Sequence, residues 1–477
     1  MYINGNWIEK GDREIVEVTN PSTGEVIEKI VKADDEDLEE AVDAAESAFD
    51  DWRNLSGEKR GSYLDGIVDS LEKNEEEIAK DLTREQGKPL SEARGEVSAS
   101  IKAFRYYARK ARDLKGGIYP TDSKDVRSYV IKQPVGPVAA ISPWNYPLLL
   151  LSWKVAPALA AGCTVVSKPA TQTPISVSDL YDSIDDAGFP EGVANLIYGS
   201  GSDIGKKLVK HEKIRKVAFT GQTSTGKQIM KDASVNVKEL TLELGGHCPM
   251  IVDSQTDIER AAKSGVYRSF RNMGQICNSI NRIYVHENVY DEFVDKFVKR
   301  TSDLTIADGL KNPDADLGPM LDESGIEKVE RHIADAIKKG ANLEYGGEAP
   351  EADEYEDGNF FEPTVLTDVN HEMIVMNEET FGPVAPIMKV RNLNEAVKLS
   401  NDSIYGLVAY LFTNDMEEGL DAAEDLEYGT VGLNNVSGGD APYPYSGWKQ
   451  SGLGTELSEE GLNEYLETKH IRATKST

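Results

Sequence analysis

Cysteine and positive charge are both scarce in this chain of 477 residues. Three cysteines cannot form a disulfide framework, and an odd count leaves at least one thiol free, which fits a reducing cytosol. Lys and Arg total 52 against 83 Asp and Glu, which gives a formal net charge of -31. That balance argues against a nucleic-acid partner, which needs a basic face, and against electrostatic attraction to anionic membranes.

Long apolar runs are missing as well. The first ten residues lack the apolar core of a signal peptide. Residues 148–166 are the only candidate membrane span, and Lys154, Pro157 and Gly162 interrupt them, so a buried helix followed by a strand is expected. We therefore predict a cytoplasmic protein without a membrane partner. Its halophile-like acidity would suit a salt-rich cytoplasm, where the screening length falls to ~3 Å at 1 M salt.

Local patterns predict the organisation of the chain. Hydrophobic residues make up 39% of it, enough for sizeable cores, and a prior of ~150 residues per domain suggests about three units. Helical spacing of apolar residues predicts helices over residues 34–52, with Asp34 as N-cap, over 58–86, stopped by Gly87, and over 91–112.

Strands and helices alternate after residue 127. An exposed strand is expected at 128–133, and buried strands at 138–142, 164–167, 195–198, 216–219, 239–242 and 250–252. Helices are expected between most of them, at 148–161, 174–187, 204–210 and 225–233. This order predicts a doubly wound parallel sheet, which binds ligands at the carboxyl ends of its strands.

The rest of the chain predicts a second α/β region and an edge strand. Alternation resumes over residues 258–434, where the acidic stretch 348–357 is expected to be a surface loop. A final strand at 470–473 follows a predicted helix at 459–466. Its expected partner is another edge strand, which could belong to a neighbouring subunit.

The three cysteines lie in different contexts. Cys163 enters an apolar strand and is expected to be a buried thiol. Cys248 follows His247, but neighbours on a strand point to opposite faces, which disfavours a Cys-His dyad. Cys277 follows Gly274, where the backbone can approach closely and an N–H could bind an oxyanion, so Cys277 is the candidate nucleophile.

Two further residues are candidates for the same chemistry. Glu243 ends an apolar strand beside two glycines, where it is either a general base in a ligand crevice or a carboxylate satisfied by loop amides. Asn145 lies in a turn between two prolines and could offer a side-chain N–H donor. Glycine-rich turns at 199–205 and 221–226 are weak signals of a dinucleotide site on their own.

Together these segments resemble the aldehyde dehydrogenase superfamily over nearly the whole chain. The resemblance rests on Pro-Trp-Asn-Tyr-Pro (143–147), Lys-Pro-Ala (168–170), Phe-Thr-Gly (219–221), Glu-Leu-Gly-Gly (243–246), Gly-Gln-Ile-Cys (274–277) and Glu-Thr-Phe-Gly-Pro (379–383), in the family's order.

The resemblance implies the fold class and the domains. We expect an α/β aldehyde dehydrogenase-like fold with a doubly wound parallel sheet for the cofactor, a second α/β catalytic domain and a small β oligomerisation element. The implied bounds are 1–118 and 135–246 for the cofactor-binding domain, 247–445 for the catalytic domain, and 119–134 with 446–477 for the oligomerisation element. A homodimer or homotetramer is expected.

The resemblance also implies a mechanism. The Cys277 thiolate would attack the aldehyde carbon, while the Asn145 amide and the Cys277 N–H hold the oxyanion. After hydride transfer to a nicotinamide, Glu243 would activate the water that hydrolyses the thioester. No metal is needed. Because CoA-acylating relatives typically lack this glutamate, a hydrolytic product is expected.

Cofactor contacts are implied at matching positions. Lys168 would contact the adenosine ribose or its phosphate, Glu379 the nicotinamide ribose, and Phe381 would pack beside the ring. NAD-preferring relatives commonly carry Glu where this chain has Thr171, which favours NADP or dual use of NADP and NAD. Gln222 replaces a common Ser near the pyrophosphate. The full set of implied cofactor residues is Trp144, Lys168, Thr171, Gly221, Gln222, Glu379 and Phe381.

The substrate is less determined by the sequence. Arg271 matches an Arg with which succinate-semialdehyde dehydrogenases bind a carboxylate, whereas Trp153 stands where that branch has a second Arg. We expect a small polar or acidic aldehyde; 2-oxoglutarate semialdehyde, glyceraldehyde and lactaldehyde are alternatives to a succinate-semialdehyde-like substrate. A binding or structural protein without turnover and a cysteine hydrolase are the competing classes.

Overall fold

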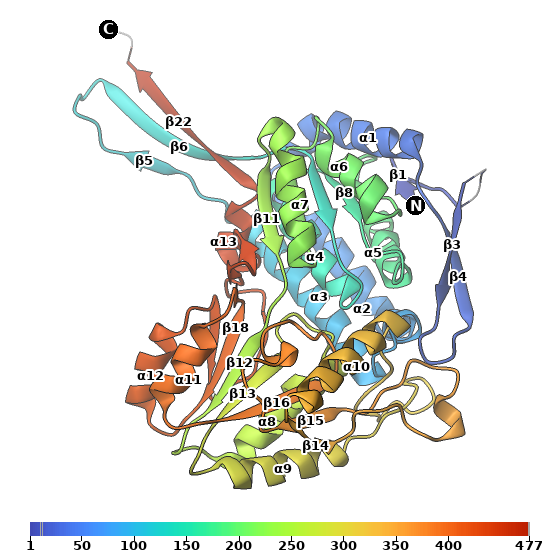
Figure 1. Ribbon diagram of the computed structural model, residues 1–477. Coiled ribbons are helices and arrows are strands. Elements are labelled where there is room, and N and C mark those ends of the chain that lie inside the picture. Colours follow the sequence, from blue (N-terminus) through green and yellow to red (C-terminus); the bar gives the residue numbers. More distant parts are fainter. Residues whose placement is uncertain (10, 12, 476–477) are drawn as a thin grey trace.

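The computed structural model describes residues 1–9, 11 and 13–475 (Figure 1). Two sheets flanked by helices form two halves of the molecule, and a narrow arm projects from them. Residues 10 and 12 of the first expected domain and 476–477 of the expected oligomerisation element lie outside the described residues.

Three N-terminal helices form where the spacing predicts them. They are α1 (Asp35–Arg53), α2 (Gly57–Gln86) and α3 (Leu90–Ala111). The Asp34 side chain accepts hydrogen bonds from the backbone N–H groups of Glu36 and Asp37 and so caps α1. Gly87 ends α2 with a φ of 88°, a conformation that glycine adopts without strain.

The first large sheet has the order β2-β1-β9-β8-β7-β10-β11-β21. Its strands are β1 (Tyr2–Ile3), β2 (Asn6–Trp7), β7 (Val138–Ile141), β8 (Val165–Lys168), β9 (Ala194–Leu196), β10 (Lys216–Thr220), β11 (Glu239–Glu243) and β21 (Gly452–Leu453). The five strands from β9 to β11 are parallel. In this sheet β8 and β9 lie on one side of β7, whereas β10 and β11 lie on its other side. The strand order therefore reverses between β7 and β10, and such sheets bind ligands at this point.

The connecting helices match the predicted ones, with one shorter than expected. They are α4 (Pro147–Ala161), α5 (Ile175–Asp186), α6 (Lys206–Lys210) and α7 (Thr223–Ala233). The helix predicted from residue 204 becomes α-helical only at Lys206, because the glycine-rich residues Gly201–Gly205 form a π-helical turn instead.

The second large sheet confirms the second α/β region. Its order is β14-β15-β16-β13-β12-β18-β19, and β14 alone runs antiparallel to its neighbour. The strands are β12 (Cys248–Val252), β13 (Ile280–His286), β14 (Asn342–Tyr345), β15 (Thr364–Thr367), β16 (Val384–Val390), β18 (Val408–Phe412) and β19 (Thr430–Leu433). The helices are α8 (Ile258–Phe270), α9 (Tyr290–Ser302), α10 (Glu323–Lys338), α11 (Leu393–Asn401) and α12 (Met416–Asp425). Residues 348–357 form the expected loop, with one short 3-10 turn at Asp353–Tyr355.

The arm is an antiparallel sheet of β5 (Gly117–Tyr119), β6 (Val126–Pro134) and β22 (Leu466–Thr474) (Figure 1). The predicted helix at 459–466 and strand at 470–473 had the wrong boundary. Helix α13 (Ser458–Asn463) ends early and β22 starts at Leu466, because pairing with β6 begins there, at Pro134. The partner of this strand is therefore β6 of the same chain.

Small strand pairs complete the fold. β3 (Ile15–Thr19) pairs with β4 (Val26–Val31), and β17 (Tyr405–Gly406) pairs with β20 (Trp448–Lys449). β21 pairs with β11, so residues 448–453 join the two large halves rather than the arm.

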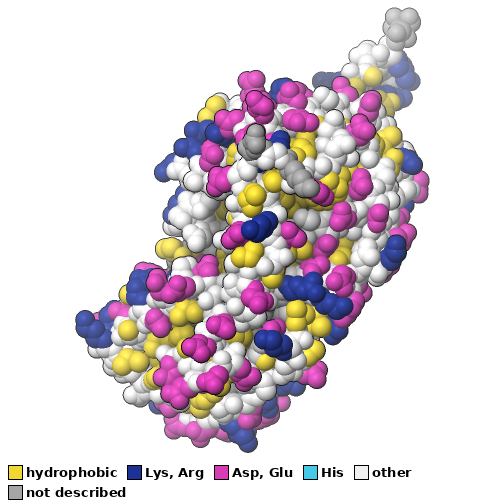
Figure 2. All heavy atoms as spheres, turned by 90° about the vertical axis from the view of Figure 1, so that its right-hand side faces the viewer, with side chains coloured by type: hydrophobic (Ala, Val, Ile, Leu, Met, Phe, Trp, Pro, Cys, Tyr) yellow, Lys and Arg dark blue, Asp and Glu magenta, His cyan; other side chains and the backbone are white. Residues whose placement is uncertain are grey.

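Burial separates two cores from an acidic surface. One buried cluster draws almost entirely on residues 1–244 and the other mainly on residues 248–457. Figure 2 shows Asp and Glu side chains spread over one face of both halves, with Lys and Arg in fewer spots. Within the described part of the chain, no helix has the length and apolarity that a membrane crossing needs.

Candidate active site

Cys277 lies in a constrained loop between α8 and β13. The loop passes through Asn272, Met273 and Gly274, which have positive φ values of 49°, 56° and 67°. A β-carbon on Gly274 would lie 2.2 Å from the Gly382 carbonyl oxygen, so only glycine permits this approach. Strain of this kind persists only where the surroundings hold it, and it often marks functional loops.

The Cys277 side chain is partly exposed. Burial raises its pKa to about 12, a hydrogen bond with Tyr445 lowers it, and the charge of Glu243 raises it further. The Tyr445 hydroxyl lies 3.7 Å from Cys277 Sγ, and it is the only side chain hydrogen-bonded to that sulfur among the described residues. This leaves a cysteine hydrolase without the histidine base that it would need.

Asn145 is brought to the Cys277 loop by the turn after β7. The side chain is buried, and its Nδ2 donates to the Gln275 carbonyl oxygen at 2.9 Å. Its backbone oxygen accepts hydrogen bonds from Lys88 Nζ at 2.8 Å and from Asn272 Nδ2 at 3.3 Å. Hydrogen bonds therefore fix both the side-chain amide and the backbone of Asn145.

A buried ion pair supports this turn. Lys88 and Glu96 form a salt bridge with both side chains fully buried. The second carboxylate oxygen of Glu96 accepts from the N–H groups of Leu148 and Leu149, both at 3.1 Å, at the start of α4. The pair thus joins α3, and the turn that precedes it, to the segment that carries Asn145.

Removing the cation of this pair should be costly. We expect Lys88→Met to lower the free energy of unfolding by ~3–5 kcal/mol, because it leaves the buried Glu96 carboxylate without its counter-ion. Chemical denaturation measures this loss. The control is Arg94→Met, which breaks the exposed pair with Glu76 and should change stability little. Equal effects of the two substitutions would contradict the prediction.

Glu243 ends β11 with both carboxylate oxygens buried and without hydrogen-bond partners among the described protein atoms. Burial raises its pKa well above the usual value, and the charge of Glu456 adds to this, while Lys154 opposes it. Lys154 Nζ binds Glu456 Oε1 at 2.7 Å and Thr220 Oγ1 at 2.6 Å. Because its pKa is raised, the ionised Glu243 carboxylate is a strong proton acceptor, and its oxygens are free to bind a water molecule.

The charge of Glu379 also raises the pKa of Cys277. Glu379 Oε1 accepts from the Gly246 N–H at 3.0 Å, and burial raises the pKa of Glu379 to about 7. A β-carbon on Gly245 would lie 2.8 Å from Glu379 Oε2, so the glycine leaves that oxygen accessible. Phe381, two residues after Glu379, packs edge to face on Trp144, with ring centroids 5.5 Å apart.

The remaining predicted cofactor residues follow the carboxyl ends of the parallel strands. Lys168 ends β8; its Nζ donates to the Pro169 carbonyl, and burial lowers its pKa to about 8. Thr171 is half-buried in the turn after β8. Gly221 donates its N–H to the Glu243 carbonyl at 2.9 Å, and exposed Gln222 caps the start of α7 without a side-chain bond to it.

These features fit a dinucleotide. Lys168 is buried and has no carboxylate within ion-pair distance in the described part of the chain, which suits a phosphate. The uncapped N–H groups at the start of α7 suit a pyrophosphate. The Glu379 carboxylate, left open by Gly245, suits ribose hydroxyls.

Arg271 and Trp153, the predicted substrate residues, have different surroundings. Arg271 Nε donates to Glu92 Oε1 at 2.8 Å, and the Tyr146 hydroxyl donates to the same oxygen, so the charge of Arg271 is already matched. Trp153 is buried and packs edge to face on Tyr445, with centroids 5.5 Å apart.

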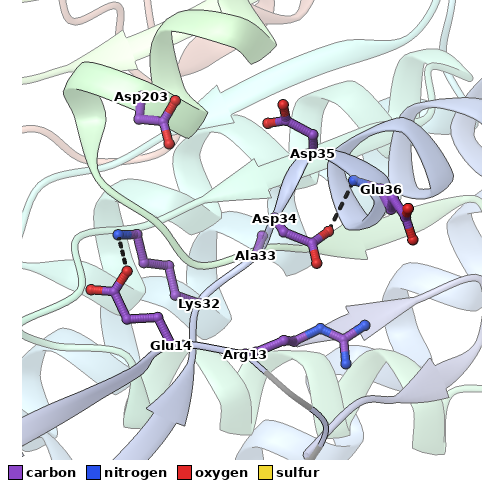
Figure 3. A pocket seen from close by; sticks show the side chains of 8 residues that line it. All are labelled: Arg13, Glu14, Lys32, Ala33, Asp34, Asp35, Glu36 and Asp203. Atoms are coloured by element: carbon purple, nitrogen blue, oxygen red, sulfur yellow. Dashed lines mark hydrogen bonds and ion pairs between the residues drawn. The ribbon is translucent and has the colours of Figure 1, made fainter.

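A separate hollow lies at the start of α1 and contains none of the predicted site residues (Figure 3). Its charged groups are engaged with one another: Lys32 Nζ binds Glu14 at 2.7 Å, and Asp34 accepts from the Glu36 N–H at 2.9 Å. It offers no nucleophile and no buried base.

Sequence reasoning missed the residues that support the predicted ones. These are Lys88, Glu96, Lys154, Tyr445 and Glu456. One signal was visible: Lys154 is the only charge in an otherwise apolar helix, and a buried lysine needs a distant partner. That partner, Glu456, lies 302 residues away in the sequence.

A partly exposed thiol, an amide fixed beside it and an unpartnered carboxylate lie where a doubly wound sheet meets a second α/β unit. The model of the Aldehyde dehydrogenase family matches residues 7–471, and the chain belongs to that family. The resemblance and the α/β fold predicted from the sequence are thereby confirmed.

Two semialdehyde dehydrogenases and one solved structure are among the proteins most similar to this chain. The chain is 40% identical over 470 residues to the glutarate-semialdehyde dehydrogenase of Pseudomonas putida, covering 98% of this chain and 96% of the relative. It is 40% identical over 469 residues, with the same coverage, to the succinate-semialdehyde dehydrogenase [NADP(+)] GabD of Escherichia coli K12. The crystal structure of an aldehyde dehydrogenase from Brucella melitensis biovar abortus superposes with a TM-score of 0.97 at 39% identity, covering 100% of this chain and 97% of the other.

Proposed function

We propose that the protein oxidises a small polar or acidic aldehyde, of the succinate-semialdehyde kind, to the carboxylic acid with NADP or NAD. The observation that carries the proposal is the placement of an unpartnered, buried Glu243 carboxylate close enough to Cys277 for its charge to raise the thiol pKa. The two semialdehyde dehydrogenases at 40% identity support the substrate class.

Different residues of the chain carry out the attack on the aldehyde and the hydrolysis of the thioester. The Cys277 thiolate attacks the aldehyde carbon, and the Asn145 Nδ2 and the Cys277 N–H stabilise the oxyanion. The nicotinamide, when bound, accepts the hydride. Glu243 then activates the water that hydrolyses the Cys277 thioester.

The test is reduced-cofactor formation at high salt, with semialdehydes as substrates. The panel includes succinate and glutarate semialdehydes, with 2-oxoglutarate semialdehyde, glyceraldehyde and lactaldehyde as the alternatives. Turnover of an aldehyde to its acid without CoA is expected. Absence of turnover with every aldehyde and both cofactors would refute the proposal and favour a binding protein.

We propose the cofactor residues of the sequence analysis as the dinucleotide site, with Lys168 and Thr171 nearest the adenosine ribose. Thr171→Glu should shift the preference between NADP and NAD by at least ~10-fold toward NAD, because a carboxylate repels a 2′-phosphate and accepts from a ribose hydroxyl. The ratio of kcat/KM values for the two cofactors measures the shift. Thr173→Ser, a buried position two residues on, is the control. An unchanged ratio in Thr171→Glu would show that Thr171 does not choose the cofactor.

We further propose the domain division expected from the sequence, except that residues 448–453 belong with the two large halves, and that the arm mediates a homodimer or homotetramer. Its support is the exposure of apolar side chains on a projecting antiparallel sheet, where Ile118 is 76% and Tyr119 57% exposed. The three-stranded arm leaves β22 and β5 as open edges.

A further inference from the structure

A buried guanidinium in the catalytic half has no counter-ion among the described residues. Arg268, in the last turn of α8, is 2% exposed. Its Nε donates to the Tyr410 hydroxyl at 2.9 Å, and its Nη2 is buried without a hydrogen-bond partner. No carboxylate of the described residues forms an ion pair with it, and Glu92, the carboxylate bound by nearby Arg271, is already engaged. A buried, unpaired charge is strongly unfavourable unless something else compensates it.

Contacts link this guanidinium to the reacting thiol. The Tyr410 hydroxyl, which accepts from Arg268, donates to the backbone oxygen of Asn278 at 2.8 Å, and Asn278 directly follows Cys277. The positive charge of Arg268 lowers the pKa of the Cys277 thiol, against the larger effect of burial. Asn278 Nδ2 donates to the Tyr445 hydroxyl at 3.2 Å, and that hydroxyl contacts Cys277 Sγ.

Gly438 leaves space beside the side chains of Arg268 and Asn278. A β-carbon on Gly438 would lie 2.7 Å from Arg268 Nη2 and 3.2 Å from Asn278 Nδ2. The φ of Gly438 is not in the left-handed region, so its backbone conformation does not demand glycine. What glycine provides here is space in front of the two nitrogen atoms.

We propose that Arg268 binds the carboxylate at the far end of the aldehyde substrate, with Gly438 providing the room for it. The assignment rests on the proposed oxidation of a small aldehyde and selects its acidic members. An anion at this place would pair with the free Nη2 and supply the missing counter-charge, in a charge-assisted hydrogen bond. Arg271, the arginine expected from the sequence, has its own carboxylate in Glu92.

The experiment compares acidic and neutral aldehydes of equal length. Wild type, Arg268→Met and Arg271→Met are assayed with succinate semialdehyde against butanal, and with glutarate semialdehyde against pentanal. For Arg268→Met, the kcat/KM ratio of acidic to neutral aldehyde should fall by about 10- to 100-fold, mainly through KM, because a charge-assisted bond to the substrate is lost. Gly438→Ala should lower the same ratio, because its methyl group takes the place of the carboxylate.

Two outcomes would overturn the assignment. One is an equal loss for acidic and neutral aldehydes, which would mean that Arg268 acts on folding or on the thiol. The other is a selective loss confined to Arg271→Met.

A binding measurement separates this proposal from the proposed function. Succinate or glutarate should raise the thermal unfolding temperature of the wild-type protein, and that increase should disappear in Arg268→Met. Retention of the increase in the variant would refute the role of Arg268. If the wild-type protein binds these dicarboxylates through Arg268 but oxidises no aldehyde, the proposed function fails while the anion site stands.

Discussion

Aldehyde oxidation should disappear in the Cys277→Ala variant, with kcat lowered by on the order of 10⁴-fold or more. Removal of a nucleophile leaves only the catalysis that binding and oxyanion stabilisation provide. The structure offers no substitute: Cys248 is fully buried, and its thiol donates to the Cys277 backbone oxygen at 3.6 Å. Steady-state formation of reduced cofactor, with the best aldehyde of the panel, measures the loss.

Cys163→Ala is the matched control for this variant. Cys163 is buried in the other core, where its thiol contacts the Tyr465 backbone oxygen at 3.5 Å. Its removal should leave kcat within a few-fold of wild type. Substantial oxidation by Cys277→Ala would remove Cys277 from the mechanism.

Glu243→Gln should show one fast turnover and then stall. We expect kcat to fall by ~10²- to 10⁴-fold, the usual range for a lost general base. Because hydrolysis of the thioester then limits the rate, rapid mixing should reveal a burst of about one equivalent of reduced cofactor per Cys277. Glu239→Gln, at the exposed start of the same strand, is the control and should show no burst.

The pH profile gives a second readout of Glu243. Burial raises its pKa well above the usual value, and only the ionised carboxylate can accept a proton. The kcat of the wild-type enzyme should therefore fall as the pH drops through this raised pKa, whereas the variant should lack that acidic limb. A burst-free variant with an unchanged limb would assign the base to another residue.

Local signals predicted most of the fold because they act within a few residues. The Asp34 cap of α1 and the Gly87 end of α2 follow from short-range hydrogen bonding and backbone sterics. The boundary of β22 could not be predicted in this way. Its start is set by pairing with Pro134, more than three hundred residues earlier.

In the candidate site, too, local motifs could be predicted from the sequence and distant contacts could not. Cys277, Glu243 and Asn145 stand in motifs whose order along the chain carries the family resemblance. The partners that tune them cannot be found locally, since Lys154 binds Glu456 across 302 residues and Arg271 binds Glu92 across 179. Arg271 illustrates the consequence: its sequence position suggested a substrate contact, and only the fold reveals the carboxylate that it already binds.

The close approach of Gly274 to the Gly382 carbonyl oxygen has a mechanical consequence. One side of this contact is the loop that ends in the thiol, and the other is the segment that carries Glu379 and Phe381. With no side chain between them, neither backbone can shift without pushing the other. The position of Cys277 and the positions of Glu379 and Phe381, proposed to bind the nicotinamide end of the cofactor, are therefore coupled. A backbone displacement on one side of the contact displaces the other side.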